Sequence, residues 1–273
     1  MSRPVITLLY TGADRTERMA GAWKSAADVV IFDLEDAVAA SRKDEARNNL
    51  RDFLSGSAPR AIHVRINHSS TPWHADDVAL INEAPSFVEV RVPKVESAAD
   101  VQALATAMPE RRLHVLLETA LGVERAFEIA TAHEAVASIG LGEADLRGDL
   151  RVDGDEGLTF ARMRVVLAAR AAGLPSPHMS VFANVRDTTG LAASCADGRA
   201  LGFRGRAAIH PSQLETIDAA FRPTAAELER ARLVLAAIET ATQAGTGAIA
   251  LADGTFLDVA MIERARETVA LAE

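Results

Sequence analysis

Short apolar runs recur along the chain every few tens of residues, and amphipathic stretches separate them. Most of the runs are rich in Val, Ile and Leu and apolar without alternation, which is typical of strands buried on both faces. Two prolines, Pro175 and Pro177, crowd the entry to the seventh run. The pattern predicts eight strands, at Val5–Tyr10, Val29–Leu34, Ala61–Asn67, Val88–Pro93, Leu113–Glu118, Ala137–Gly142, Met179–Ala183 and Ala207–His210.

The stretches between the strands have helical spacing, and glycine or proline ends several of them. Strands and helices that alternate and stop at eight predict a parallel TIM (β/α)8 barrel, an α/β fold, rather than an open sheet. The predicted helices include Arg15–Ala26, Lys43–Leu54, Ala98–Met108, Glu124–Ala132, Phe160–Ala172 and Gly190–Leu201.

We assign residues 1–222 to the barrel and residues 223–273 to a C-terminal arm. The arm begins with a predicted helix over Pro223–Ala241, in which Thr224 and Glu227 form a capping box. Asp253-Gly254 lies between two apolar stretches of Ala248–Asp258 and predicts a hairpin. A last helix is predicted over Val259–Ala272. Such an arm could cover its own active-site face or reach a neighbouring subunit.

Composition narrows the class of protein. The net charge of −9 argues against a nucleic-acid or membrane partner, and an anionic substrate would need a local cluster of Arg and Lys. The single Cys195 excludes a disulfide framework within the chain and suits a reducing compartment. No apolar run approaches the ~20 residues that span a bilayer. Met1–Pro4 leads straight into a strand, so we expect a cytoplasmic protein without a signal peptide.

Charged side chains stand at the carboxyl ends of five successive predicted strands. In a β/α barrel these ends converge on one face, where the chemistry is done. The sequence therefore predicts an active site built from Asp33-Leu34-Glu35-Asp36, Arg65, Lys94, Glu118, and Glu143 with Asp145.

Glu118 and Asp145 are the candidate metal ligands, because they follow adjacent strands and Mg²⁺ often takes only one or two protein carboxylates. The alternative is that each caps the helix that follows it. Glu143 is two residues from Asp145 and is expected to support the site rather than to coordinate.

The acidic cluster after the second strand has two interpretations. Glu35 and Asp36 could hold metal-bound waters and orient basic side chains, or Asp36 could be the N-cap of a helix over Ala37–Ala40. Arg65 needs a partner inside its apolar strand. It could grip a substrate carboxylate, pair with the Asp33–Asp36 cluster, or do both.

Three further positions have weaker signals. Lys94 could hold a phosphate or join a ring of salt bridges. A role as a Schiff-base lysine is disfavoured, because imine chemistry is redundant beside a pair of metal-binding carboxylates. Gly12, in Gly12-Ala13-Asp14-Arg15, could present backbone N–H groups to a phosphate. His210 is a possible acid or base, but a structural histidine is favoured.

Several motifs together resemble the citrate lyase β-subunit-like branch of the HpcH/HpaI aldolase superfamily, which includes malyl-CoA and citramalyl-CoA lyases. Their order and spacing hold over about residues 5–240. The matching segments are Val29–Val38, Val64–Asn67, Val92–Ser97, Leu117–Ala120, Gly142–Leu146, Leu201–Gln213 and Phe221–Thr224.

This resemblance implies a TIM barrel that binds Mg²⁺ through Glu118 and Asp145, with Arg65 at the substrate's acid end. As further candidates we assign catalytic roles to Glu35 and Asp36, and substrate-binding positions to Gly12, Lys94 and Ala144. The implied reaction is reversible carbon–carbon cleavage of a 3-hydroxyacyl-CoA to acetyl-CoA, or propionyl-CoA, and a 2-oxo acid. Some members hydrolyse the thioester instead. Asp258 of the arm would serve the adjacent subunit of a homotrimer or hexamer.

Three departures from the family pattern leave the CoA portion and the acyl group open. Thr11-Gly12 replaces a Pro-Gly pair, Met179 stands where members carry an aspartate, and Asp258-Val259-Ala260 replaces Asp-x-Pro. Two other functions stay open, namely a metal-dependent aldolase that acts on free acids such as pyruvate, and a citryl-cleaving β subunit within a citrate lyase complex. The second would need an acyl-carrier protein as partner.

Overall fold

The computed structural model describes residues 4–56, 60–244, 249–250, 256–257 and 259–272. Two compact units make up the chain, one spanning Val5–Ala220 and the other Phe221–Glu273. Within the part of the chain that is described, no helix is both long enough and apolar enough to cross a membrane.

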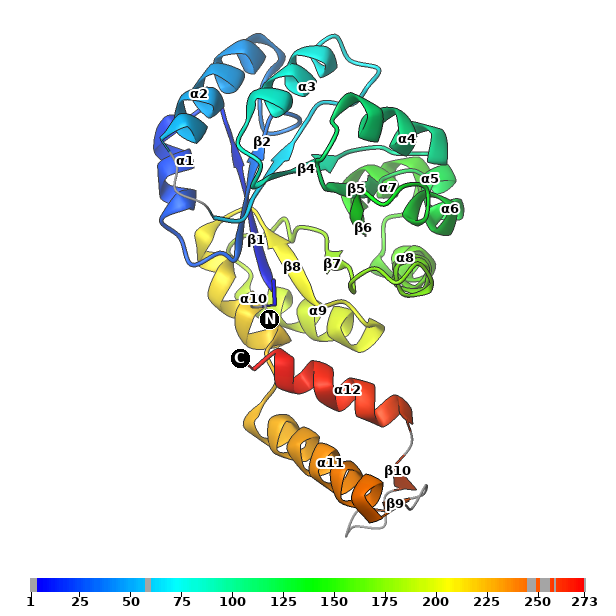
Figure 1. Ribbon diagram of the computed structural model, residues 1–273. Coiled ribbons are helices and arrows are strands. Elements are labelled where there is room, and N and C mark those ends of the chain that lie inside the picture. Colours follow the sequence, from blue (N-terminus) through cyan, green and yellow to red (C-terminus); the bar gives the residue numbers. More distant parts are fainter. Residues whose placement is uncertain (1–3, 57–59, 245–248, 251–255, 258, 273) are drawn as a thin grey trace. The chain divides into compact units, whose positions relative to one another are not determined.

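The larger unit is a parallel eight-stranded β/α barrel, as the sequence predicts. The hydrogen-bonded order of the strands is β6-β5-β4-β3-β2-β1-β8-β7, and Figure 1 shows them at the centre of the unit with the helices outside. The strands are β1 (Thr7–Gly12), β2 (Val29–Asp33), β3 (Ile62–Arg65), β4 (Val88–Val92), β5 (Leu113–Leu117), β6 (Val136–Leu141), β7 (His178–Met179) and β8 (Gly205–Ala208).

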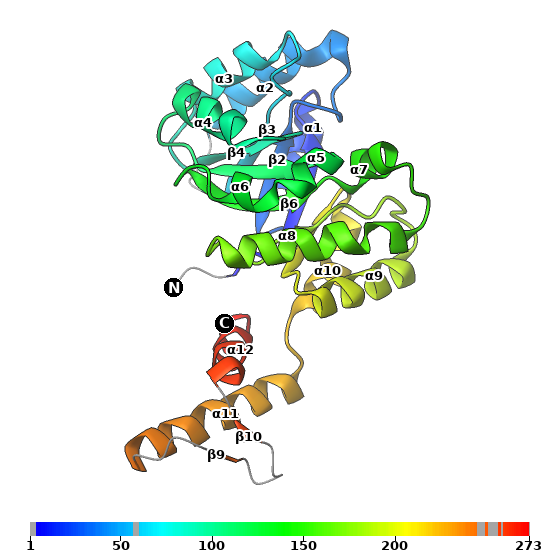
Figure 2. The same cartoon turned by 90° about the vertical axis from the view of Figure 1, so that its right-hand side faces the viewer.

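Helices cover the outer face of the strands. Figure 2 shows α2, α3 and α4 on one side of them and α8, α9 and α10 on the other. The α-helices of this unit are α1 (Thr16–Trp23), α2 (Lys43–Ser55), α3 (His74–Glu83), α4 (Ala98–Ala107), α5 (Ala120–Glu124), α6 (Ala126–Ala130), α7 (Glu143–Leu150), α8 (Thr159–Ala171), α9 (Thr188–Leu201) and α10 (Leu214–Phe221).

Strand β7 differs from its prediction and leaves the barrel nearly closed. It spans only His178–Met179, so the predicted extent of Met179–Ala183 is wrong. It begins at His178 instead of Met179 and ends at Met179 instead of Ala183, because its ladder with β8 contains only the pairs His178–Gly205 and Met179–Arg206. Among the described residues β6 and β7 share no ladder, although a Cβ at Gly140 of β6 would lie 3.9 Å from the His178 carbonyl oxygen. The two strands therefore lie next to each other without pairing in a ladder.

The barrel interior is apolar on one side and polar on the other. Leu8, Val29, Ile31 and Ala207 form a buried apolar cluster from β1, β2 and β8. Strands β3, β4 and β5 instead carry polar residues at alternate positions, so they depart from the apolar pattern that most of the predicted strands have. These residues are His63, Arg65, Glu89, Arg91 and His114.

The smaller unit contains the predicted helix, hairpin and helix. Thr224 and Glu227 form the capping box before α11 (Ala225–Ala244): the Thr224 N–H donates to Glu227 Oε2 at 2.7 Å and the Glu227 N–H donates to Thr224 Oγ1 at 3.2 Å. Strands β9 (Ile249–Ala250) and β10 (Phe256–Leu257) pair antiparallel. Helix α12 (Val259–Ala270) follows. The predicted turn residues Asp253 and Gly254 lie outside the described residues.

Candidate active site

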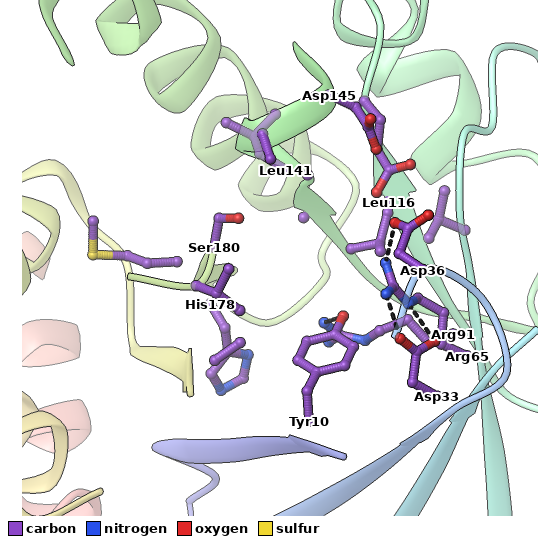
Figure 3. Close-up of a pocket in the computed structure, with 18 of the residues that line it drawn as sticks. Tyr10, Asp33, Asp36, Arg65, Arg91, Leu116, Leu141, Asp145, His178 and Ser180 are labelled. Carbon is purple, nitrogen blue, oxygen red and sulfur yellow. Dashed lines mark hydrogen bonds and ion pairs between the residues drawn. The ribbon is translucent and has the colours of Figure 1, made fainter. Parts of the chain in front are cut away.

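A cavity of about 340 Å³ extends from the carboxyl ends of the strands into the polar side of the barrel. Figure 3 shows its labelled residues, which come from strands all around the barrel and point toward one another. Six positions predicted from the sequence line it: Asp33, Asp36, Arg65, Glu118, Ala144 and Asp145.

Three carboxylates converge on the ammonium group of Lys94. The Lys94 Nζ lies 3.0 Å from Glu35 Oε1, 3.2 Å from Asp145 Oδ2 and 3.6 Å from Glu118 Oε2. Of the alternatives for Lys94, the ring of salt bridges is the one that the structure contains. The ammonium group holds the place that suits a cation among these oxygens, and hard divalent cations prefer such carboxylate ligands.

Glu118 is the most deeply buried of these three carboxylates. Its side chain is only 2% exposed, and its Oε2 has no hydrogen-bond partner within the described residues. Burial, and next the negative charge of Glu35, raise the pKa of Glu118 to about 7. A Cβ at position 142 would overlap the Glu118 carboxylate, so the glycine there is required by this close approach. The buried, unsatisfied oxygen fits a metal ligand.

Arg65 is held by the acidic cluster after β2. Its Nε and Nη2 donate to the two Asp33 carboxylate oxygens at 2.8 and 2.6 Å. Its Nη1 lies 2.9 Å from Glu35 Oε2 and 3.3 Å from Asp36 Oδ2. Burial opposes the charge, but the Asp33 carboxylate outweighs it and the pKa of Arg65 is raised well above its usual value. The predicted internal ion pair is therefore present, and three of the five guanidinium N–H groups donate hydrogen bonds to Asp33 and Asp36 in the described structure.

Two buried cations that the sequence did not single out fix the loops that bear the acids. Lys43 Nζ donates to the carbonyl oxygens of Leu34 and Glu35 at 2.6 and 2.7 Å, which anchors the loop after β2. Arg162 of α8 donates to both oxygens of Glu143, at 2.8 and 2.7 Å. Glu143 is thus a supporting residue, as expected, and its partner became visible only in the fold.

The remaining predicted positions have structural surroundings of their own. The alternative that Asp36 is an N-cap is wrong, because no helix begins at residue 37 and the 3-10 helix Ala40–Arg42 has Ala39 at its N-cap. A Cβ at Gly12 would lie 3.0 Å from the Ala37 carbonyl oxygen, so packing explains this glycine. His210 caps Pro211–Gln213 by accepting from the Ser212 N–H, which is the structural role that was favoured. Asp258 lies outside the described residues.

The deeper cavity wall contains polar residues that the sequence analysis missed. Tyr10, Arg91, Ser138 and His178 all line it. A period of two in Glu89-Val90-Arg91 was the available signal, since alternate residues of a strand face the same side. The run of β-branched residues around them concealed it.

Residues 7–211 match the sequence profile of the HpcH/HpaI aldolase/citrate lyase family. The chain is an enzyme of this family. It is 39% identical over 281 residues to a (3S)-malyl-CoA thioesterase of Cereibacter sphaeroides, with 100% of this chain and 96% of the relative covered. It is 34% identical to the citrate lyase subunit beta of Leuconostoc mesenteroides subsp. cremoris, with 97% and 92% covered.

Solved structures of the family agree with the fold. The CitE protein of Mycobacterium tuberculosis, solved in complex with magnesium, acetoacetate and coenzyme A, is 35% identical and superimposes with a TM-score of 0.82 over 99% of both chains. A structure of the citrate lyase β subunit from M. tuberculosis with oxaloacetate and magnesium is 36% identical, with a TM-score of 0.71 over 81% of this chain and 99% of that one. The similarity to solved family members therefore extends over nearly the whole chain.

Proposed function

We propose that this family member is a Mg²⁺-dependent carbon–carbon lyase of 3-hydroxyacyl-CoA thioesters of the malyl-CoA or citramalyl-CoA type. Its products would be acetyl-CoA, or propionyl-CoA, and a 2-oxo acid. The observation that carries the proposal is the convergence of Glu35, Glu118 and Asp145 on one cation position at the mouth of the cavity. The structures of relatives with magnesium, coenzyme A and small oxo acids support the same substrate class.

Glu118 and Asp145 are the residues that would hold Mg²⁺, and the unsatisfied Glu118 oxygen supports this assignment. When bound, the ion supplies a Lewis acid that stabilises negative charge on a substrate oxygen. Glu35 and Asp36 would order the surrounding water and keep Arg65 oriented. Lys94 would keep its contact with Glu35 beside an ion held by Glu118 and Asp145. Ala144 and Gly12 would bound the substrate.

Substrate binding would use Arg65 to contact the carboxylate of the 2-oxo-acid half. In the cleavage, a base takes the hydroxyl proton and the hydroxyl-bearing carbon becomes the carbonyl carbon of the 2-oxo acid. Its bond to the carbon next to the thioester breaks, and that electron pair passes to the thioester as an enolate. That enolate must take up a proton to become the acyl-CoA product. Asp258 is the proposed donor, reached from a neighbouring chain of a trimer or hexamer.

Thioester hydrolysis is the second candidate activity. It is favoured by the full-length similarity to proteins named (3S)-malyl-CoA thioesterase. Hydrolysis and cleavage share the same acyl-CoA substrate, so one site could serve both. The free-acid aldolase and the citryl-cleaving β subunit remain alternatives, the latter because of relatives named citrate lyase subunit beta.

An assay of the purified protein with Mg²⁺ against malyl-CoA, citramalyl-CoA and citryl-CoA tests the proposal, with 2-oxo acid and free thiol measured separately. Release of 2-oxo acid identifies a lyase, and free thiol alone identifies a thioesterase. Activity on pyruvate plus aldehydes with none on any CoA ester would refute both.

Glu118→Gln should lower turnover by about 10³-fold, the equivalent of several kcal/mol of charge stabilisation. Added Mg²⁺ should no longer raise the melting temperature of this variant. Glu124→Gln, on the exposed surface of α5, is the matched control and should behave as the parent protein. Near-normal turnover of Glu118→Gln would refute the metal assignment.

A further inference from the structure

Arg91 is a buried cation whose charge has no partner. It belongs to β4, is only 7% exposed and lines the cavity. Its Nη1 donates to the Tyr10 hydroxyl at 3.1 Å, and its guanidinium lies 5.8 Å from the centre of the Tyr10 ring. Its Nε is buried without a hydrogen-bond partner, and no carboxylate of the described residues pairs with it. Burying an unpaired charge is costly, so a structural role accounts poorly for this arginine.

On the neighbouring strand, the charge of an arginine is compensated by carboxylates. Arg65 of β3 is the register partner of Arg91. The two guanidinium groups lie side by side next to Tyr10 in Figure 3. Arg65 contacts three carboxylates, which neutralise it. Arg91 is therefore the cation of the cavity that has charge left for a ligand.

The other ionisable groups around Arg91 do not supply the missing negative charge. Burial lowers the pKa of His63, His114 and His178, and the positive charge of Arg91 lowers each of them further, so the three imidazoles are neutral at pH 7. Glu89, the nearest acid on the same strand, is engaged at 2.5 Å by His114 Nε2 and is within 3.6 Å of both His63 and Arg112.

We propose that Arg91 and Tyr10 form a second anion site inside the cavity, for a carboxylate other than the one next to the metal pair. The Tyr10 hydroxyl accepts from Arg91, which leaves its own proton free to donate to such a group. The chemical class of the ligand is a 2-oxo acid, or the corresponding acyl-CoA, that carries a second carboxylate. This inference rests on the proposed lyase site but goes beyond the proposed substrates, because malyl-CoA and citramalyl-CoA release 2-oxo acids with a single carboxylate. It narrows the substrate to an analogue of citramalyl-CoA that carries a second carboxylate.

The consequence is a preference among 2-oxo acids. A monocarboxylate product would cover Arg91 and leave it unpaired, whereas a dicarboxylate would pair with it. Hydrogen bonds to charged groups correspond to a preference of about 10- to 100-fold. Oxaloacetate and 2-oxobutyrate are a matched pair of ligands, because they have the same number of carbons and differ in a carboxylate in place of a methyl group.

Calorimetric titration of the full-length protein in the presence of Mg²⁺, with freshly prepared oxaloacetate and with 2-oxobutyrate, tests the inference. The parent protein should bind oxaloacetate about 10- to 100-fold more tightly. Arg91→Met should abolish this preference by weakening oxaloacetate alone, with 2-oxobutyrate changed less than about threefold. Tyr10→Phe should reduce the preference in part. Arg112→Met removes an exposed arginine at the start of β5 and should leave the preference intact.

Equal affinity of the parent protein for both acids, or a preference that survives in Arg91→Met, would overturn the inference. The comparison of two ligands on the parent protein does not depend on how any variant folds, and Arg91→Lys, which keeps the charge, should retain part of the preference. Failure of the proposed function has a separate signature: neither acid would then bind in a manner that needs Mg²⁺ and an intact Glu118.

Discussion

Lys94 has a backbone conformation that residues with side chains rarely adopt. Its φ is +54°, in the left-handed region where a Cβ is unfavourable. Burial opposes the charge of Lys94, but the carboxylates of Glu35 and Glu118 outweigh it and raise its pKa above the usual value. Such backbone strain persists at functional sites where the surroundings enforce it. Here the surroundings include the carboxylates of Glu35, Glu118 and Asp145, which pair with the Lys94 ammonium group.

At the same scale, the desolvated histidines make stability depend on pH. The half-buried imidazole of His178 donates from Nε2 to the Val5 carbonyl oxygen at 2.9 Å, and desolvation, the largest cause, lowers its pKa to about 4 from 6.5. Between pH 6.5 and 4 the unfolded chain binds a proton at this residue and the folded chain does not. Stability should therefore fall as the pH falls through this window, by about 3 kcal/mol for His178.

Urea denaturation of the parent protein and of His178→Gln at pH 7.5 and pH 4 checks this expectation. The difference in unfolding free energy between the two proteins should shift by about 3 kcal/mol against the parent at the lower pH. His133→Gln, at an exposed histidine, serves as the control. A difference that is the same at both pH values would contradict the prediction.

At the scale of elements, a proposed metal ligand at a strand end is followed directly by the N-cap residue of the next helix. Thr119 follows Glu118 directly and its Oγ1 accepts from the Gly122 N–H at 3.1 Å, which begins α5. Ser97 caps α4 in the same way, at 3.2 Å from the Asp100 N–H. The alternative that Glu118 itself caps the helix is wrong, because the adjacent threonine has that role. The short loops therefore fix the backbone next to the acid.

Thr119→Ala should lower the free energy of unfolding by about 1 kcal/mol, because it removes an N-cap acceptor. Thr106→Ala is the matched control: its hydroxyl donates to the Gln102 carbonyl oxygen on an exposed helix face, and we expect a change within about 0.5 kcal/mol. Chemical denaturation measures both values. Equal effects of the two substitutions would show that the cap contributes nothing specific.

At the scale of the whole molecule, the chain divides between a barrel unit and a unit formed by residues 221–273. The barrel unit contains the metal candidates, and the smaller unit contains the sequence position of Asp258. Helices α11 and α12 have a core of their own, with Ala231, Val234, Leu257 and Ala265. In the proposed function, Asp258 of the arm serves the active site of a neighbouring chain in an oligomer.

Mixed oligomers test that requirement. Chains with Asp258→Ala and chains with Glu118→Gln should each be inactive alone, and coassembly should restore activity, because an active site can then combine an intact Glu118 with a neighbour's Asp258. Turnover of the mixture, measured against coassembled pools of Glu118→Gln only, provides the readout. No recovery in verified mixed oligomers would place Asp258 outside the neighbour's site.

The sequence by itself determined the eight β/α units, the capping box at Thr224 and the set of charged strand ends. These rest on local periodicity and on the rule that parallel strand ends converge, so they need no knowledge of which side chains meet. The length of β7 was predicted wrongly because its ladder with β8 ends at Met179, and an apolar run does not show where pairing stops. Apart from Arg65, the alternate polar residues of β3–β5 were not singled out, because they lie among apolar residues.

Only the tertiary structure decided the pairing of charges. Lys94 meets Glu35 across 59 residues of sequence, and Arg91 meets Tyr10 across 81. A single sequence gives the types of these residues but not their distances, and an ion pair or an unpaired charge depends on distances of a few ångströms. The same residue type therefore acquired opposite states on adjacent strands, with Arg65 neutralised by carboxylates and Arg91 left with a charge for a ligand.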